Sequence, residues 1–360
     1  MLTTTAAFAL AACTRPDGSS APGTTPLSAG SSTTAPTTSQ PSTTSTSLPT
    51  TTTSTTTSTT TSSTTSSTTT TTAPTTEPTE PTTETTTEPT TETTAEGTAA
   101  STAPGAYDRE ALYVALYGHP GSTILGVLGE QDAEAGARRA IEVAAAYEGF
   151  GRRVVPTFEI LASVASAEAG SDGDFSNEFS FDKFAPHLLV AAANEMHVVL
   201  DLQTGRGRFP DQAREYEELW LQPHTSIALD PEWRVGPDEQ PGGGRIGTVD
   251  AGEVNETIDY LDALITANGL PPKMCIVHQF TPSMITNKQQ IRGTDNVQVL
   301  IQMDGFGSLE LKRGSWARTV SDLPPGAFTG WKNFYDEDQP TPTPAETMAN
   351  EPAPRFVSFQ

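Results

Sequence analysis

The sequence predicts an α/β protein in which a (β/α)8 (TIM) barrel, residues 105–360, follows a disordered Thr/Ser/Pro-rich tether. The C-terminal segment has about the length of one such barrel, roughly 250 residues. Within it, short apolar runs recur between turn residues, usually with a helical pattern between them, which is typical of parallel βα units. No Gly-x-Gly-x-x-Gly motif follows the first run and no P-loop is present, so a nucleotide-binding fold would lack its phosphate-binding loop. An open, doubly wound sheet is the alternative fold.

Eight apolar runs are the predicted strands of the barrel. A parallel strand that is buried on both faces reads as a nearly continuous apolar run, and these segments have that character. In chain order, they cover residues 112–117, 153–158, 197–202, 225–229, 274–278, 297–301, 327–333 and 355–359.

Helices are predicted between most of these strands. Asp132 precedes an Ala-rich helix over residues 133–147, and residues 181–195 and 211–221 are amphipathic. Asp250 and Glu253 have the spacing of a capping box ahead of a helix over residues 254–267, which Gly269 ends. The segments after the fifth and sixth strands are short and only weakly helical.

The N-terminal residues predict export and a lipid anchor. The order Leu10-Ala11-Ala12-Cys13 resembles the lipobox of bacterial lipoproteins. This resemblance implies that residues 1–12 are a signal peptide and that Cys13 becomes the lipidated N-terminus, carrying diacylglyceryl and palmitate-type chains. The apolar run is short and no Lys or Arg precedes it, as in a truncated signal peptide. The whole chain resembles actinobacterial lipoproteins, which implies the extracellular face of the cell membrane.

Residues 13–104 form the predicted tether. They are almost entirely Thr, Ser, Pro and Ala, with an acidic repeat near the end, and contain too few apolar side chains to offset the entropy of ordering. At about 3.1 Å per residue, an extended tether of this kind would reach a few hundred Å, into the cell wall. Both an O-glycosylated stalk and an unmodified spacer fit this composition.

Charge and cysteine content exclude several classes of function. The net charge is −24, and no basic cluster is longer than a pair such as Arg152-Arg153, so nucleic acid and anionic lipid surfaces are not expected partners. No run after Cys13 approaches the ~18 apolar residues that span a bilayer, which leaves the lipid as the expected membrane anchor. Cys13 and Cys275 are the two cysteines, and Cys275 lies in an apolar run, so no disulfide framework is predicted.

Polar side chains follow one predicted strand after another at its carboxyl end, where barrel active sites are built. A group of carboxylates in a concave site raises the pKa of some members, so that one stays protonated while another is ionised. Glycoside hydrolysis requires such a pair. Residues two apart share a face of a strand, and three pairs have this spacing: Asp201 with Gln203, Asp230 with Glu232, and Gln302 with Asp304.

The segment from Ile227 to Glu232 resembles the strand-4 Asp-x-Glu motif of glycosidase barrels, including the family-25 lysozymes and the family-18 chitinases. The resemblance implies that Glu232 is the general acid/base, and that Asp230 supports its charge or orients an N-acetyl group. The ending Phe359-Gln360 is similar to strand 8 of family 25. The first strand lacks the Asp of family 25, and Ala228 stands where the longer chitinase motif has another Asp.

The predicted function is therefore a cell-surface glycoside hydrolase that acts on a cell-wall or extracellular polysaccharide, such as a peptidoglycan-like glycan. Glu232 is the predicted acid/base, and the second carboxylate is expected from Asp201, Asp304 or Asp230, in that order. No cofactor and no metal are predicted. The predicted substrate-binding residues are Trp233, His119, Gln203, His278, Gln302, Tyr117 and Gln360.

Two other functions remain open. The missing strand-1 Asp favours a barrel that binds glycan without cleaving it. A hydrolase with a carboxylate-bound divalent metal is the third reading, although the His spacing does not match a zinc motif. Its ligands would be Asp201, Asp230, Glu232 and His278.

Overall fold

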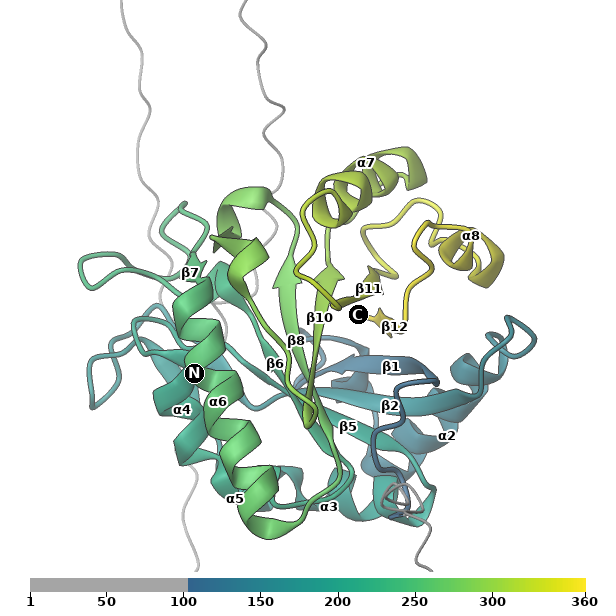
Figure 1. Ribbon diagram of the computed structural model, residues 1–360, viewed down its shortest axis with the longest axis horizontal. Helices are drawn as coiled ribbons and strands as arrows, with labels where there is room; N and C mark the ends of the chain where they lie inside the picture. Colours follow the sequence, from purple (N-terminus) through teal and green to yellow (C-terminus); the bar gives the residue numbers. More distant parts are fainter. Residues whose placement is uncertain (1–102) are drawn as a thin grey trace, which may run out of the picture. The chain divides into compact units, whose positions relative to one another are not determined.

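The computed structural model describes residues 103–360, which form a closed barrel of eight parallel strands with helices on its outside (Figure 1). This confirms the predicted (β/α)8 barrel over the open sheet. Cys13 and all but the last two residues of the predicted tether (13–104) lie outside the described residues. Among the described residues, no helix combines the length and apolar character needed to cross a membrane.

The barrel strands follow one another in chain order around the barrel, and the last pairs with the first, Tyr113 opposite Phe356. Each observed strand overlaps one of the eight predicted strands. Their bounds are β1 (Leu112–Gly118), β2 (Val154–Leu161), β5 (His197–Leu202), β6 (Thr225–Leu229), β8 (Lys273–Gln279), β10 (Val297–Met303), β11 (Phe328–Asn333) and β12 (Phe356–Phe359).

The helices begin and end largely at the residues that the sequence marks. Asp132 accepts a hydrogen bond from the Ala135 N–H at the start of α2, and Gly269 ends α6 in the left-handed conformation, with φ 60°. The predicted helix over 211–221 is divided in two at Tyr216. The bounds are α2 (Ala133–Ala145), α3 (Phe181–Ala193), α4 (Phe209–Glu215), α5 (Glu217–Trp220), α6 (Ala251–Asn268), α7 (Leu309–Val320) and α8 (Pro344–Met348).

The predicted capping box of α6 is wrong. Asp250 does cap the helix, but it accepts from the Gly252 N–H, and the helix begins at Ala251. The Glu253 carboxylate does not return to the cap. It accepts instead from the Phe209 N–H and from Arg234, because these distant groups offer it charge-assisted hydrogen bonds.

Short elements complete the connections. The antiparallel pair β3 (Ser163–Ala165) and β4 (Ser176–Glu178) follows β2, and β7 (Val249–Asp250) pairs with β9 (Ile285–Thr286). The 3-10 turns are η1 (Val127–Glu130), η2 (Pro231–Trp233), η3 (Pro282–Met284) and η4 (Lys288–Gln290).

The connection between β8 and β10 contains only η3, β9 and η4 and no α-helix. Lys288 fastens it instead. The buried Lys288 ammonium donates 2.8 Å hydrogen bonds to Gln279 Oε1 and to the Thr319 carbonyl, and it forms an ion pair with Asp322. A single buried cation therefore ties this connection both to the end of β8 and to α7. The connection after β10, also predicted to be weakly helical, contains the full helix α7.

We expect Lys288→Met to lower the free energy of unfolding by about 2–4 kcal/mol, because it leaves the carbonyl and carboxylate partners without a donor. Arg292→Met is the control, since Arg292 forms a bidentate but exposed pair with Asp259 at 2.7 Å. An exposed pair of this kind contributes about 1 kcal/mol or less. Urea denaturation of the two variants measures both values, and equal losses would contradict the role given to Lys288.

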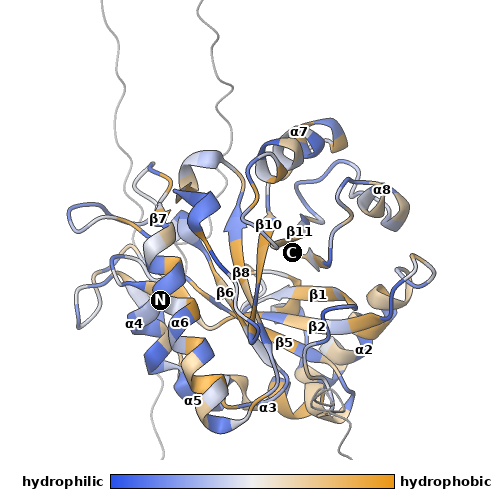
Figure 2. Cartoon of the chain, in the orientation of Figure 1, coloured by the Kyte–Doolittle hydropathy of each residue, from blue (hydrophilic) through white to orange (hydrophobic). Residues whose placement is uncertain are grey.

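The barrel has two apolar layers, to which the strands contribute the apolar residues coloured orange in Figure 2. The larger lies between the strands and the helices and contains Cys275, which is fully buried. The smaller layer fills the part of the barrel interior that is nearer the amino-terminal ends of the strands. Inward-facing residues alternate along each strand, so the next inward positions toward the carboxyl ends are occupied by polar residues: Tyr117, Glu159, Asp201, Asp230, His278, Gln302 and Lys332.

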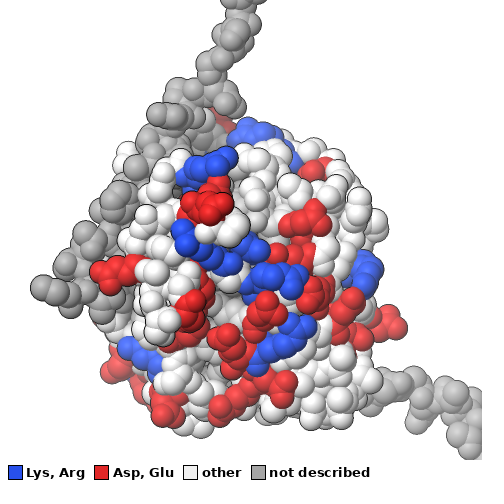
Figure 3. Space-filling view, turned by 90° about the vertical axis from the view of Figure 1, so that its left-hand side faces the viewer, with Lys and Arg blue, Asp and Glu red and all other residues white. Residues whose placement is uncertain are grey.

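Charged side chains are interspersed on the outside of the barrel. Figure 3 views the side that carries α4 and α6 and shows basic and acidic groups next to one another. Ion pairs account for this arrangement, among them Arg208 with Glu256 at 2.5 Å and Arg214 with Asp211 at 3.0 Å.

Candidate active site

A pocket of about 180 Å³ opens at the carboxyl ends of the barrel strands. Its polar wall contains seven of the residues proposed from the sequence: Tyr117, Gln203, Asp230, Glu232, Trp233, Asp304 and Gln360. Lys332 and Glu337 add a cation and another carboxylate. The apolar wall comprises Ile124, Leu125, Leu161, Val164, Ala165, Phe280, Phe306 and Phe334. The site thus combines clustered acids with aromatic surface.

His278 lies beneath the pocket, fully buried between two carboxylates. Its Nδ1 is 3.1 Å from Asp304 Oδ2, and its Nε2 is 3.2 Å from Glu159 Oε1. Burial alone would lower the pKa of His278, but the charge of Asp201 and the hydrogen bonds to Asp304 and Glu159 outweigh burial and raise that pKa well above its ordinary value. His278 is therefore an imidazolium that donates from both nitrogens.

Asp201 is also fully buried and does not line the pocket. The Tyr117 hydroxyl donates a 3.1 Å hydrogen bond to Asp201 Oδ2. Burial raises the pKa of Asp201, while the nearby His278 opposes the rise. Asp201 is thus separated from the pocket by Tyr117 and belongs to the charged layer below it.

Asp230 has two tasks. Its Oδ1 accepts from the Glu232 N–H at 3.2 Å and so caps the η2 turn, while its Oδ2 accepts from Gln203 Nε2 at 3.2 Å inside the pocket. Asp230 therefore both caps the turn and lines the pocket. Burial, followed by the charge of Asp201, raises the pKa of Asp230 to about 7.

Glu232 lies in the η2 turn, half-buried in the pocket wall. The Gly247 N–H donates to the Glu232 carbonyl at 2.7 Å, and a Cβ at Gly247 would lie 2.5 Å from that oxygen, so only glycine permits this contact. Burial and the charges of Asp230 and Asp304 raise the pKa of the Glu232 carboxyl well above its ordinary value. This shift favours the protonated form of the Glu232 carboxyl.

Three of the residues predicted to bind substrate do not line the pocket. His278 and Gln302 are buried beneath it, and Gln302 donates to Ser358 Oγ at 3.0 Å. His119 points elsewhere, with its Nδ1 2.9 Å from the Leu161 carbonyl and its ring 4.1 Å from that of Phe179. In this structure His119 packs the connection after β1 against its neighbours.

Three charged residues of the site are absent from the proposed set: Glu159, Lys332 and Glu337. Glu159 directly follows the predicted second strand, residues 153–158, but β2 continues to Leu161 and its alternation turns Glu159 inward. Lys332 shares the parity of Phe328 and Gly330 in β11, so strand alternation was a usable signal for it. Glu337 lies in the connection after β11 and has no local signal.

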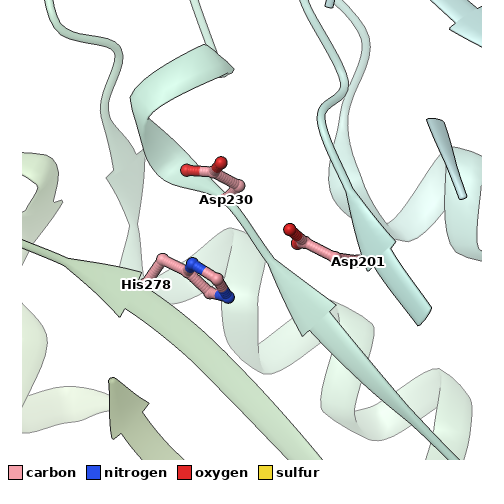
Figure 4. A group of neighbouring side chains, drawn as sticks. All are labelled: Asp201, Asp230 and His278. Atoms are coloured by element: carbon pink, nitrogen blue, oxygen red, sulfur yellow. The ribbon is translucent and has the colours of Figure 1, made fainter. Parts of the chain in front are cut away.

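Asp201, Asp230 and His278 are close enough to suggest a metal site, because one potential ligand atom of each lies within 4.8 Å of the others (Figure 4). Both nitrogens of His278 face carboxylates, however, and a metal ligand needs an unprotonated nitrogen. The three residues therefore offer a metal ion only the carboxylates of Asp201 and Asp230. The positive charge of the His278 imidazolium explains why these two carboxylates lie close to it.

No family model matches the chain, and no curated protein matches it. Among solved structures, the chain is similar to a Burkholderia cenocepacia J2315 protein named "putative lyase/mutase", with 15% identity over 71% of this chain and 78% of that chain and a TM-score of 0.39. It is also similar to the cellulose synthase subunit Z of Clostridioides difficile, with 11% identity over 69% and 91% and a TM-score of 0.37. A cellulase, Cel5C_n, has 12% identity over 61% and 65%, with a TM-score of 0.33. Likeness at this level carries no inference about the reaction.

Proposed function

We propose that this barrel is a glycoside hydrolase that acts on a polysaccharide, with Glu232 as the general acid/base. The observation that carries the proposal is the state of Glu232, a carboxyl in the pocket wall whose pKa is raised by burial and by two neighbouring acids. A carboxyl that keeps its proton at neutral pH is what protonation of a glycosidic oxygen requires.

The second carboxylate is best supplied by Asp304. It lines the pocket, unlike Asp201, and the His278 imidazolium donates a 3.1 Å hydrogen bond that fixes its Oδ2. Asp230 also lines the pocket, but its two oxygens already serve the η2 turn and Gln203. This order differs from the one based on sequence, in which Asp201 came first.

The chemistry then divides between the two residues. Glu232 donates its proton to the oxygen of the leaving sugar as the glycosidic bond breaks, and the Asp304 carboxylate either attacks the anomeric carbon or activates a water molecule. Trp233 and Phe306 offer ring surfaces to the apolar faces of the sugar units. The site needs no metal for these steps, and both nitrogens of His278 are engaged with carboxylates.

The direct test is to incubate the full chain with cellulose, xylan, chitin and peptidoglycan and to measure the release of reducing ends. Turnover of at least one of these polymers supports the proposal. If a polymer binds but no turnover is detected throughout the range from pH 4 to pH 8, the glycan-binding barrel is favoured instead.

We further propose that the barrel is held at the extracellular face of the membrane through lipid on Cys13, from which residues 14–104 carry it into the cell wall. The support is the order Leu10-Ala11-Ala12-Cys13 and the Thr/Ser/Pro composition that follows.

We expect the full-length protein to partition into the detergent phase of a Triton X-114 extract, and Cys13→Ser to shift it to the aqueous phase and the medium. The lipid supplies most of the membrane affinity, at about 0.8 kcal/mol per buried methylene group. Cys275→Ser is the control, since that thiol is buried in the barrel. Identical partitioning of Cys13→Ser and the parent would overturn the anchor.

A further inference from the structure

Lys332 is an unusual buried lysine. It is 3% exposed, it lines the pocket, and its Nζ lies 3.4 Å from the centroid of the Tyr117 ring. Its ammonium has no hydrogen-bond or salt-bridge partner among residues 103–360, and its Nζ is not one of the enclosed side-chain atoms that lack a partner, so it is open to the pocket.

The other buried lysines of the barrel are fully used. Lys273 donates to two carbonyls at 2.8 and 2.9 Å, and Lys288 and Lys312 each donate to a carbonyl and to a side-chain oxygen. Leaving buried donors without acceptors is costly. The hydrogen-bonding capacity of Lys332 is therefore directed at whatever fills the pocket.

We propose that Lys332 is a substrate-binding residue, whose ammonium donates hydrogen bonds to oxygen atoms of an uncharged sugar unit next to Glu232. This inference rests on the proposed function and names its substrate class. Hydroxyl groups can accept from Lys332 and at the same time donate to Asp304 or Glu337 in the same pocket. A sugar that carries a carboxylate would instead meet these acids with a like charge.

The same ammonium acts on the acids of the site before substrate arrives. Its positive charge opposes the rise in the pKa of both Asp230 and Glu232. Lys332 thus favours ionisation in a pocket where burial and neighbouring acids favour protonation. The titratable groups that act on Asp230 or feel its charge are Tyr117, Asp201, Glu232, His278, Asp304 and Lys332.

Binding tests the proposal without requiring turnover. The full chain, Lys332→Met and Lys332→Arg are titrated with cellotetraose, xylotetraose, chitotetraose and tetragalacturonate by calorimetry. Met keeps the apolar stem over Tyr117 and removes the charge, whereas Arg keeps the charge. We expect a neutral tetrasaccharide to bind the parent, Lys332→Met to weaken it at least tenfold, and Lys332→Arg to restore most of the affinity.

A second measurement reports a role that mere packing would not produce. Carbon-13 NMR of aspartate-labelled protein follows the Asp230 carboxyl, assigned with Asp230→Asn, between pH 4 and pH 9. Removing a nearby positive charge favours the protonated acid, so its apparent pKa should rise by about one unit in Lys332→Met and stay near the parent value in Lys332→Arg.

The outcomes separate this inference from the proposed function. Neutral-sugar binding that depends on Lys332, without any hydrolysis, would support the inference and defeat the hydrolase. Affinity unchanged in Lys332→Met, preference for tetragalacturonate, or no binding to any of the four sugars would overturn the inference. An unshifted Asp230 titration in Lys332→Met would overturn the electrostatic part.

Discussion

Glu232→Gln should reduce the rate of glycan hydrolysis by at least about 10²-fold and leave glycan affinity nearly unchanged. Glutamine preserves the size and most of the hydrogen bonding of the side chain, but it has no acidic proton to donate to the leaving oxygen. Reducing-end assays give kcat, and calorimetry at the same pH gives affinity.

Glu337→Gln is the matched control for this prediction. Glu337 is a half-buried carboxyl of the same pocket, outside the Asp230–Glu232 turn. We expect it to change kcat by less than about tenfold, as is usual for a group that does not transfer the proton. An enzyme whose turnover survives Glu232→Gln but falls with Asp304→Asn would transfer the acid role to Asp304.

His278→Gln should lower the free energy of unfolding at pH 7 by about 3–5 kcal/mol, because it leaves buried carboxylates without their cation. Glu159 and Asp304 would lose charged donors at 3.2 and 3.1 Å, and Asp201 would lose its nearest opposing charge. Chemical denaturation measures the loss. His224→Gln is the control, since the one hydrogen bond of the buried His224 ring within residues 103–360 is to the Leu188 carbonyl at 3.2 Å, and a loss of about 1–2 kcal/mol is expected there.

The sign of the pH dependence distinguishes this account from simple loss of packing. A raised histidine pKa contributes stability that is fully present below the unfolded value and lost as the pH rises through the folded one. In His278→Gln that contribution is gone, so the stability deficit relative to the parent should be largest below about pH 6, where the histidine contribution is complete, and should shrink as the pH rises above 7. A deficit of equal size at pH 5, 7 and 9 would point to packing alone.

The barrel could be predicted because its strands are continuous apolar runs, a pattern carried by neighbouring residues. The start of α6 could not, because Glu253 is drawn away from its helix by Phe209 and Arg234. The connection after β8 also escaped prediction. Lys288 reads as an ordinary surface residue until its partner Thr319, 31 positions away, is known.

The residues that follow each predicted strand indicated an acidic site, but they did not indicate which carboxylates line the pocket and which are buried beneath it. Asp201, Asp230 and Asp304 all follow apolar runs, yet only the last two reach the pocket, because Tyr117 covers Asp201. Glu159 lies in the barrel interior because a histidine 119 residues away neutralises it. Pairings of this separation depend on barrel closure and leave no trace in local sequence.

The placement of Cys275 has a practical consequence for handling the molecule. The thiol is fully enclosed between strand and helices, and burial raises its pKa to about 12. Neither oxidants nor alkylating reagents act well on a protonated, enclosed thiol, so the folded barrel should tolerate an oxidising exterior unharmed. With Cys13 replaced, Cys275 is the only sulfhydryl left in the chain. The rate at which Ellman's reagent reacts with Cys275 then measures the rate at which the barrel opens, without any added probe.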